Sequence, residues 1–72
     1  MRKKEEFLTD REMDVLKQVI LGYSNKEIGK ILFITPHTVK AHLTQVFKKL
    51  NVTNRTAAAI KAQESGFIHP QD

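Results

Sequence analysis

The stretch TPHTVKAHLTQVFKKL, residues 35–50, has two chemically different faces if it forms one helix. Thr35 is a favourable capping residue, and Pro36 suits the first helical position, where its missing N–H costs nothing. At about 100° per residue the apolar side chains gather on one side. They are Val39, Leu43, Val46, Phe47 and Leu50, with His42 at their edge. We expect this side to pack against other helices along a helix of about 22 Å.

The opposite side of the same helix is small at its centre and basic around it. It carries His37, Lys40, Ala41, Thr44 and Lys48. Small side chains let a helix approach base edges in the ~12 Å major groove of DNA, and Lys can reach guanine or a phosphate. We interpret Lys40, Ala41 and Thr44 as candidate base contacts, with His37 as a further one. An ordinary solvated helix face is the alternative, and for His37 the two readings are evenly balanced.

Charge is unevenly distributed along the 72 residues, whose net charge is +4. Residues 1–27 hold six acidic and six basic side chains, whereas residues 28–63 hold six basic ones and no Asp or Glu. Such a segment favours a polyanionic partner, although a solvated basic surface is common. Lys48 and Lys49 are therefore candidate phosphate contacts.

Capping signals divide the rest of the chain into three further helices, and no stretch alternates with the period of a strand. Thr9 with Glu12 and Ser24 with Glu27 both fit the capping box. Turn and end signals follow at Gly22, at Phe33-Ile34 and at Asn51. A fourth helix begins after Asn54 or Thr53 and runs to Ser65, with Gly66 ending it and Phe67 and Ile68 folding back. The prediction is an all-α, four-helix bundle.

The stretch SNKEIGKILFITPHTVKAHL, residues 24–43, is typical of a helix, a short turn and the start of a second helix, which is the helix-turn-helix arrangement. In that arrangement the second helix reads the major groove and the first crosses the DNA backbone. Asn25 and Lys26 lie at the N-terminus of the first helix, where free amides and the helix dipole favour a phosphate. Arg55 starts the fourth helix, where a cation is unfavourable, so it should have a partner: a carboxylate, a carbonyl or a phosphate.

The blocks LTDREMDVL, GYSNKEIGKILFITPHTVKAHLTQVFKKLNV and NRTAAAI resemble the LuxR-type (GerE/NarL-like) DNA-binding domain of bacterial transcription regulators. The resemblance covers about residues 8–68. It implies a sequence-specific double-stranded DNA-binding domain that works as a dimer on inverted-repeat sites.

The resemblance also implies roles for individual positions. Lys40, Ala41 and Thr44 match positions that face the bases. Those that match backbone-facing positions are Asn25, Lys26, Thr35, Thr38 and Lys48. The fourth helix matches the dimer contact, here Ala57, Ala58, Ile60, Lys61 and Glu64.

Two residues depart from the pattern of the family. Gly29 replaces the usual Ala, which lowers helix propensity by up to about 1 kcal/mol. Thr44 stands where some members of the family carry a longer polar or basic side chain, so fewer direct base hydrogen bonds are expected there.

Composition bounds the remaining possibilities. One domain, residues 8–68, is expected between a flexible or linker-derived segment at 1–7 and a tail at 69–72. There is no cysteine, and His37 and His42 lie about 140° apart on a helix, so we expect no metal and no cofactor. No catalytic set or membrane span is predicted, and a cytoplasmic, non-enzymatic protein is expected.

A second function class remains open on the sequence alone. A small helical protein-interaction module would use the same basic face on an acidic partner, for example on RNA polymerase. Such a contact is also compatible with DNA binding. Absence of duplex affinity at low salt, with intact helices, would favour this alternative.

Overall fold

The computed structural model describes residues 8–64 and places four α-helices in that range. They are α2 (Asp10–Ile20), α3 (Asn25–Leu32), α4 (Pro36–Leu50) and α5 (Arg55–Glu64). Within these residues the chain forms no strand, so the predicted all-α class is confirmed. The predictions for residues 1–7, for Ser65–Ile68 and for the tail lie outside the described residues.

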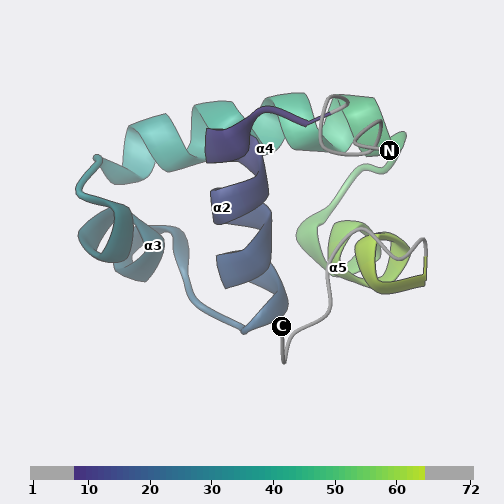
Figure 1. The fold of residues 1–72 in the computed structure, drawn as a ribbon, viewed down its shortest axis with the longest axis horizontal. Helices are drawn as coiled ribbons and strands as arrows, with labels where there is room; N and C mark the ends of the chain where they lie inside the picture. Colours follow the sequence, from purple (N-terminus) through teal and green to yellow (C-terminus); the bar gives the residue numbers. More distant parts are fainter. Residues whose placement is uncertain (1–7, 65–72) are drawn as a thin grey trace.

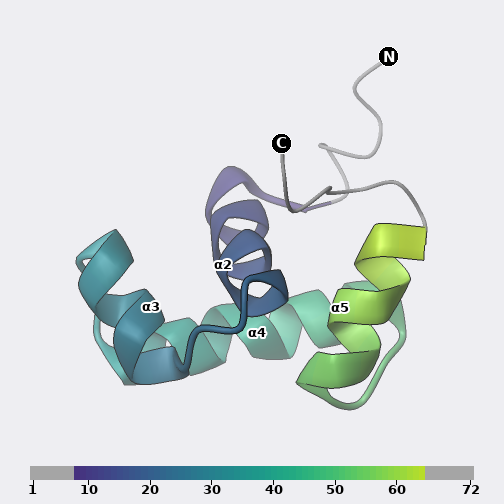
Figure 2. The same ribbon diagram turned by 90° about the horizontal axis from the view of Figure 1, so that it is seen from below.

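The four helices are arranged around α2. In Figure 1, α4 runs across one side of the molecule and α2 meets it near its middle. Figure 2 shows α3 and α5 on opposite sides of α2, with α3 beside the N-terminal part of α4 and α5 towards its C-terminal part. Each of the other three helices contacts α4. This arrangement leaves the far side of α4 uncovered.

The apolar side chains form two core clusters, and α2 contributes to both. One cluster joins α2 to the C-terminal part of α4 and to α5: Leu8, Leu16, Val46, Leu50, Ala58 and Ala62. The other joins α2 to α3 and the N-terminal part of α4: Val15, Val19, Ile28, Val39 and Leu43. Phe47 packs against both. The buried side of α4 is the one predicted from its periodicity.

Local capping explains where the helices begin. The Thr9 hydroxyl accepts a hydrogen bond from the Glu12 N–H at 3.1 Å, and the Thr9 N–H donates to Glu12 Oε1 at 3.0 Å. Ser24 and Glu27 repeat this exchange. Both predicted capping boxes are therefore confirmed. The Ala57 N–H donates to Asn54 Oδ1 at 2.8 Å, so Asn54 rather than Thr53 caps α5.

The turn between α3 and α4 is tighter than the sequence indicates. Phe33 adopts the left-handed conformation at φ 62°, with 92% of its surface exposed. The Ile34 N–H then donates to the Gly29 carbonyl at 2.9 Å. A Cβ added at Gly29 would lie 2.5 Å from the Ile34 carbonyl oxygen. The absence of a side chain at Gly29 thus lets the main chain of Ile34 approach α3 closely. This close packing explains why a glycine stands at this position despite its low helix propensity.

Candidate nucleic-acid interface

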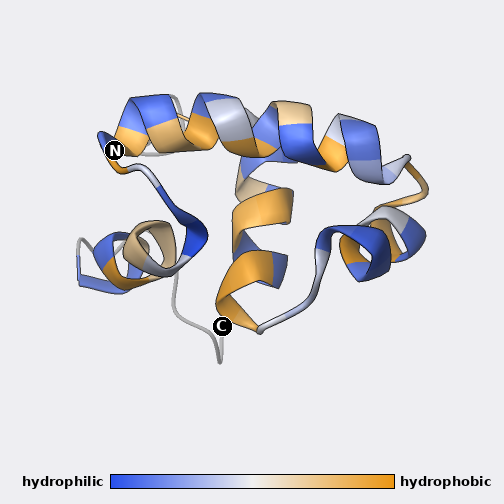
Figure 3. Cartoon of the chain, turned by 180° about the vertical axis from the view of Figure 1, so that it is seen from behind, coloured by the Kyte–Doolittle hydropathy of each residue, from blue (hydrophilic) through white to orange (hydrophobic). Residues whose placement is uncertain are grey.

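The outer side of α4 carries every predicted base-contacting residue. His37, Lys40, Ala41 and Thr44 are all exposed, whereas Val39, Leu43 and Val46 on the other side are buried. Figure 3 shows α4 with an apolar stripe towards α2 and polar residues on its outer side. Thr35 caps the helix by accepting from the Thr38 N–H at 3.0 Å. The face is therefore an exposed, regular helix surface that holds no acidic side chain.

Hydroxyl groups on this face are oriented by the helix itself. Thr44 Oγ1 donates to the Lys40 carbonyl at 3.0 Å, so its one hydrogen is already used. Thr44 therefore presents an acceptor oxygen and a methyl group. Thr35 Oγ1 donates to Thr38 Oγ1 at 3.0 Å, which leaves the Thr38 hydroxyl hydrogen available. Ala41, beside Lys40, adds only a methyl group and keeps the surface narrow.

Two lysines on α4 remain unpaired within residues 8–64. The ion pairs in this range join Arg11 to Asp14 and Lys49 to Glu12, and neither Lys40 nor Lys48 takes part. Both of these side chains are exposed. They can therefore meet an anion without first breaking an intramolecular contact.

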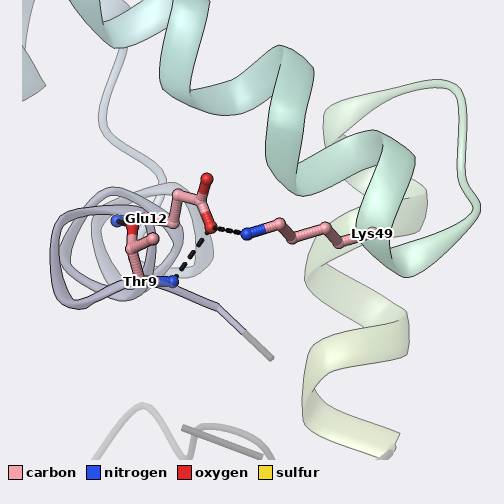
Figure 4. Close-up of polar contacts among 3 residues, drawn as sticks. All are labelled: Thr9, Glu12 and Lys49. Carbon is pink, nitrogen blue, oxygen red and sulfur yellow. Dashed lines mark hydrogen bonds and ion pairs between the residues drawn. The ribbon is translucent and has the colours of Figure 1, made fainter. Parts of the chain in front are cut away.

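Lys49, predicted with Lys48 to contact phosphate, has a partner within the chain. Its Nζ lies 2.7 Å from Glu12 Oε1, and Figure 4 shows that carboxylate also accepting from the Thr9 N–H. Burial alone would raise the pKa of Glu12. The hydrogen bonds from Lys49 and Thr9 and the charge of Lys49 outweigh it, so the pKa lies below its ordinary value of 4.5. Lys49 therefore ties α4 to α2, and a phosphate contact by its ammonium group would compete with Glu12.

The N-terminus of α3 holds the predicted phosphate contacts of the first helix. Lys26 is exposed and Asn25 is half-buried. Arg55 Nη1 donates to Asn25 Oδ1 at 2.6 Å, and Arg55 Nη2 donates to the Tyr23 carbonyl at 2.6 Å. The expected partner of Arg55 is thus a carbonyl, together with a side-chain amide that the sequence did not suggest. No sequence signal connects residues 30 positions apart.

The predicted dimer residues on α5 do not all reach the surface. Ile60 is 50% exposed, Lys61 and Glu64 are exposed, and Ala57 is half-buried. Ala58 is fully buried in the core of the chain itself, so it is withdrawn from the dimer contact. An open groove between α5 and the α2–α3 turn is lined by Ile20, Tyr23, Thr56, Ala59 and Ile60, among others.

Residues 8–64 bring no three His, Cys, Asp or Glu side chains together as metal ligands. No helix in that range is long and apolar enough to cross a membrane.

Residues 6–62 match the model of the family described as "Bacterial regulatory proteins, luxR family". The chain is 45% identical over 64 residues to the transcriptional regulatory protein LiaR of Bacillus subtilis, covering 89% of this chain and 30% of LiaR. It is 49% identical over 53 residues to the nitrate/nitrite response regulator protein NarP of Escherichia coli, covering 74% of this chain and 25% of NarP. The chain thus spans less than a third of these relatives.

Proposed function

Because the chain belongs to the luxR family of bacterial regulatory proteins, we propose that it binds double-stranded DNA sequence-specifically and regulates transcription. The observation that carries this proposal is the outer side of α4. It is exposed, free of acidic residues and narrow at Ala41, and its Lys40 and Lys48 form no ion pair with any residue in the described range 8–64. That combination suits a helix that enters the major groove.

Each exposed residue of α4 has a distinct role in this proposal. Lys40 reaches a guanine edge as a donor, and Ala41 lets the helix backbone approach the bases. Thr44 offers its methyl group to a thymine methyl and its oxygen to a base amino group, because its hydrogen is held by Lys40. His37 contacts a base at the groove entrance. Thr35, Thr38 and Lys48 position α4 against the phosphates.

The N-terminus of α3 provides a second anchor on the DNA backbone. Lys26 is exposed there, and the first amides of α3 point out of the helix. Asn25 adds a side-chain amide beside them. This anchor fixes the orientation of α4 without reading sequence itself.

Dimerisation through α5 is part of the same proposal. Ile60 exposes half of its surface, with Lys61 and Glu64 exposed on the same helix. A ten-residue helix offers little area, and interfaces below about 1,200 Å² are usually transient. We therefore propose a weak dimer that DNA strengthens on inverted half-sites. RNA polymerase is a further proposed partner.

Selection of bound duplexes from a random pool tests DNA binding, followed by titrations on selected and random duplexes. We expect Lys40→Ala to weaken binding to the selected duplex by ~1–3 kcal/mol and to relax the preference at one base pair of each half-site. Lys48→Ala should weaken all duplexes alike and flatten the salt dependence by about one unit. Lys17→Ala, which removes an exposed lysine in the last turn of α2, is the matched control.

Two outcomes would oppose this function. If Lys40→Ala lowered affinity equally on every duplex, the proposed reading of bases by Lys40 would be wrong. If the folded chain bound no duplex at low salt, the protein-interaction alternative with an acidic partner would replace DNA binding.

A further inference from the structure

Arg55 joins two parts of the chain that are far apart in sequence. It is the first residue of α5, and its guanidinium donates to the Asn25 side chain and to the Tyr23 main chain, each at 2.6 Å. Tyr23 and Asn25 flank Ser24, which caps α3. The Arg55 side chain therefore contacts both the residue that precedes the cap of α3 and the first residue of α3. A cation at the start of α5 opposes the helix dipole, so these contacts must offset that cost.

The contact with Arg55 fixes which end of the Asn25 amide faces outward. A guanidinium carries only donors, so the atom that faces it must be the amide oxygen. The Asn25 nitrogen, with its two N–H groups, then points away from Arg55. No described residue hydrogen-bonds that nitrogen, and residues 8–64 contain no buried side-chain nitrogen or oxygen without a partner. The two donors are thus accessible beside Lys26.

We propose that Arg55 is a positioning residue, which orients the Asn25 amide so that it donates to a DNA phosphate. The inference rests on the proposed function and adds to it a residue outside the helix-turn-helix. Without Arg55, the amide turns freely about its last bond and presents its oxygen to the phosphate part of the time. An oxygen that faces a phosphate repels it, so the orientation has a direct effect on binding.

Salt dependence separates this role from a direct phosphate contact by Arg55. A cation at a phosphate releases a counterion, and removing it flattens the salt dependence by about one unit. The Asn25 amide is neutral and releases none. If Arg55 acts only through Asn25, its loss lowers affinity while the slope of affinity against salt stays unchanged.

The experiment is a double-mutant cycle on duplex binding with Asn25→Ala, Arg55→Met and the double variant, measured at several salt concentrations. We expect Asn25→Ala to weaken binding about 10-fold, since a hydrogen bond to a charged group is lost. Arg55→Met should weaken binding by less, because the freed amide still donates to the phosphate part of the time. The double variant should be no weaker than Asn25→Ala alone, because Arg55 acts only through the contact that Asn25→Ala already removes. The salt slope and the base preference should match those of the unmodified chain.

Asn25→Asp keeps the test decisive if Arg55→Met folds poorly. The carboxylate still accepts from Arg55 and gains an ion pair, so the thermal midpoint should be kept or raised. It has no donor for a phosphate, so binding should fall at least as far as in Asn25→Ala. A loss of binding with retained stability shows that the Asn25 side chain lies near a phosphate, as the positioning role requires. Unchanged binding by folded Asn25→Asp would overturn it.

Other outcomes are equally informative. Additive losses together with a flatter slope for Arg55→Met would show that Arg55 contacts phosphate itself, which overturns the proposal. A lower thermal midpoint with unchanged binding of the folded fraction would show a purely structural role and also overturn it. If the unmodified chain binds no duplex at low salt, the proposed function fails, and this inference falls with it.

Discussion

The ion pair between Glu12 and Lys49 gives the sharpest prediction about stability. Glu12→Gln keeps the shape of the side chain and an oxygen that accepts from the Thr9 N–H, but it removes the charge that faces Lys49. The Glu12 side chain is 7% exposed and Lys49 is 30% exposed, with 2.7 Å between Oε1 and Nζ. The substitution therefore isolates one nearly buried charged contact.

The magnitude follows from this partial burial. A hydrogen bond between charged groups contributes roughly 1.5–3 kcal/mol, and the exposure of Lys49 places this one at the lower end. We expect Glu12→Gln to lower the free energy of unfolding by about 1.5 kcal/mol at neutral pH. For a domain of this size each 1 kcal/mol shifts the midpoint by roughly 4–8 °C, so the midpoint should fall by about 6–12 °C.

The pH dependence of this loss provides a second measurement. Because the pKa of Glu12 is lower in the folded chain than its ordinary 4.5, the contact contributes fully above that value. Its contribution is lost as the pH falls through the folded pKa. The difference between Glu12→Gln and the unmodified chain should thus be largest at neutral pH and shrink in acid.

Asp14→Asn is the matched control for thermal melts followed by circular dichroism between pH 3 and pH 7. Its partner Arg11 is 3.8 Å away and both side chains are over 40% exposed, so the expected loss is below about 0.5 kcal/mol. The reasoning would be refuted by a Glu12→Gln loss no larger than that of Asp14→Asn. A loss that stays the same at pH 3 and pH 7 would also refute it.

Three further substitutions test the turn, the lysine assignment and the dimer. Gly29→Ala should lower the free energy of unfolding by about 1–2 kcal/mol, because the added Cβ meets the Ile34 carbonyl, although alanine has the better helix propensity. A higher midpoint in thermal melts would contradict the close approach of Ile34 to Gly29. Lys49→Ala should leave the salt dependence of duplex binding unchanged, unlike Lys48→Ala, and equal flattening by both would show that Lys49 also contacts phosphate. Ile60→Glu should weaken binding to a duplex with two half-sites more than to one with a single half-site, and equal weakening in parallel titrations would argue against pairing through α5.

The helix starts and the buried side of α4 could be predicted because they depend on neighbouring residues. A capping box needs only Thr9 and Glu12, and a helical stripe needs only the spacing of residues such as Val39 and Val46. Phe33 could not be predicted in the left-handed conformation, which bulky residues disfavour. Its conformation allows the tight turn that brings Ile34 against Gly29.

Parts of the candidate site depended on contacts across the fold. Lys49 resembles Lys48 in the sequence, and the contact with Glu12, 37 residues away, could not be predicted from it. Arg55 was expected to have a partner, but Asn25 could not be identified as that partner. The alanine-rich α5 has little contrast between its sides, so periodicity could not show that Ala58 faces inward while Ile60 faces outward.

The sharing of α2 and Phe47 between both core clusters has a consequence for local opening. Neither half of the domain can separate from α2 without exposing apolar surface that the other half also uses. Amide hydrogens in the middle of α3 and α5 should therefore exchange with solvent through the same whole-domain opening. A partner that binds the outer surface of α5 would then slow amide hydrogen exchange within α3, although the two helices lie on opposite sides of α2.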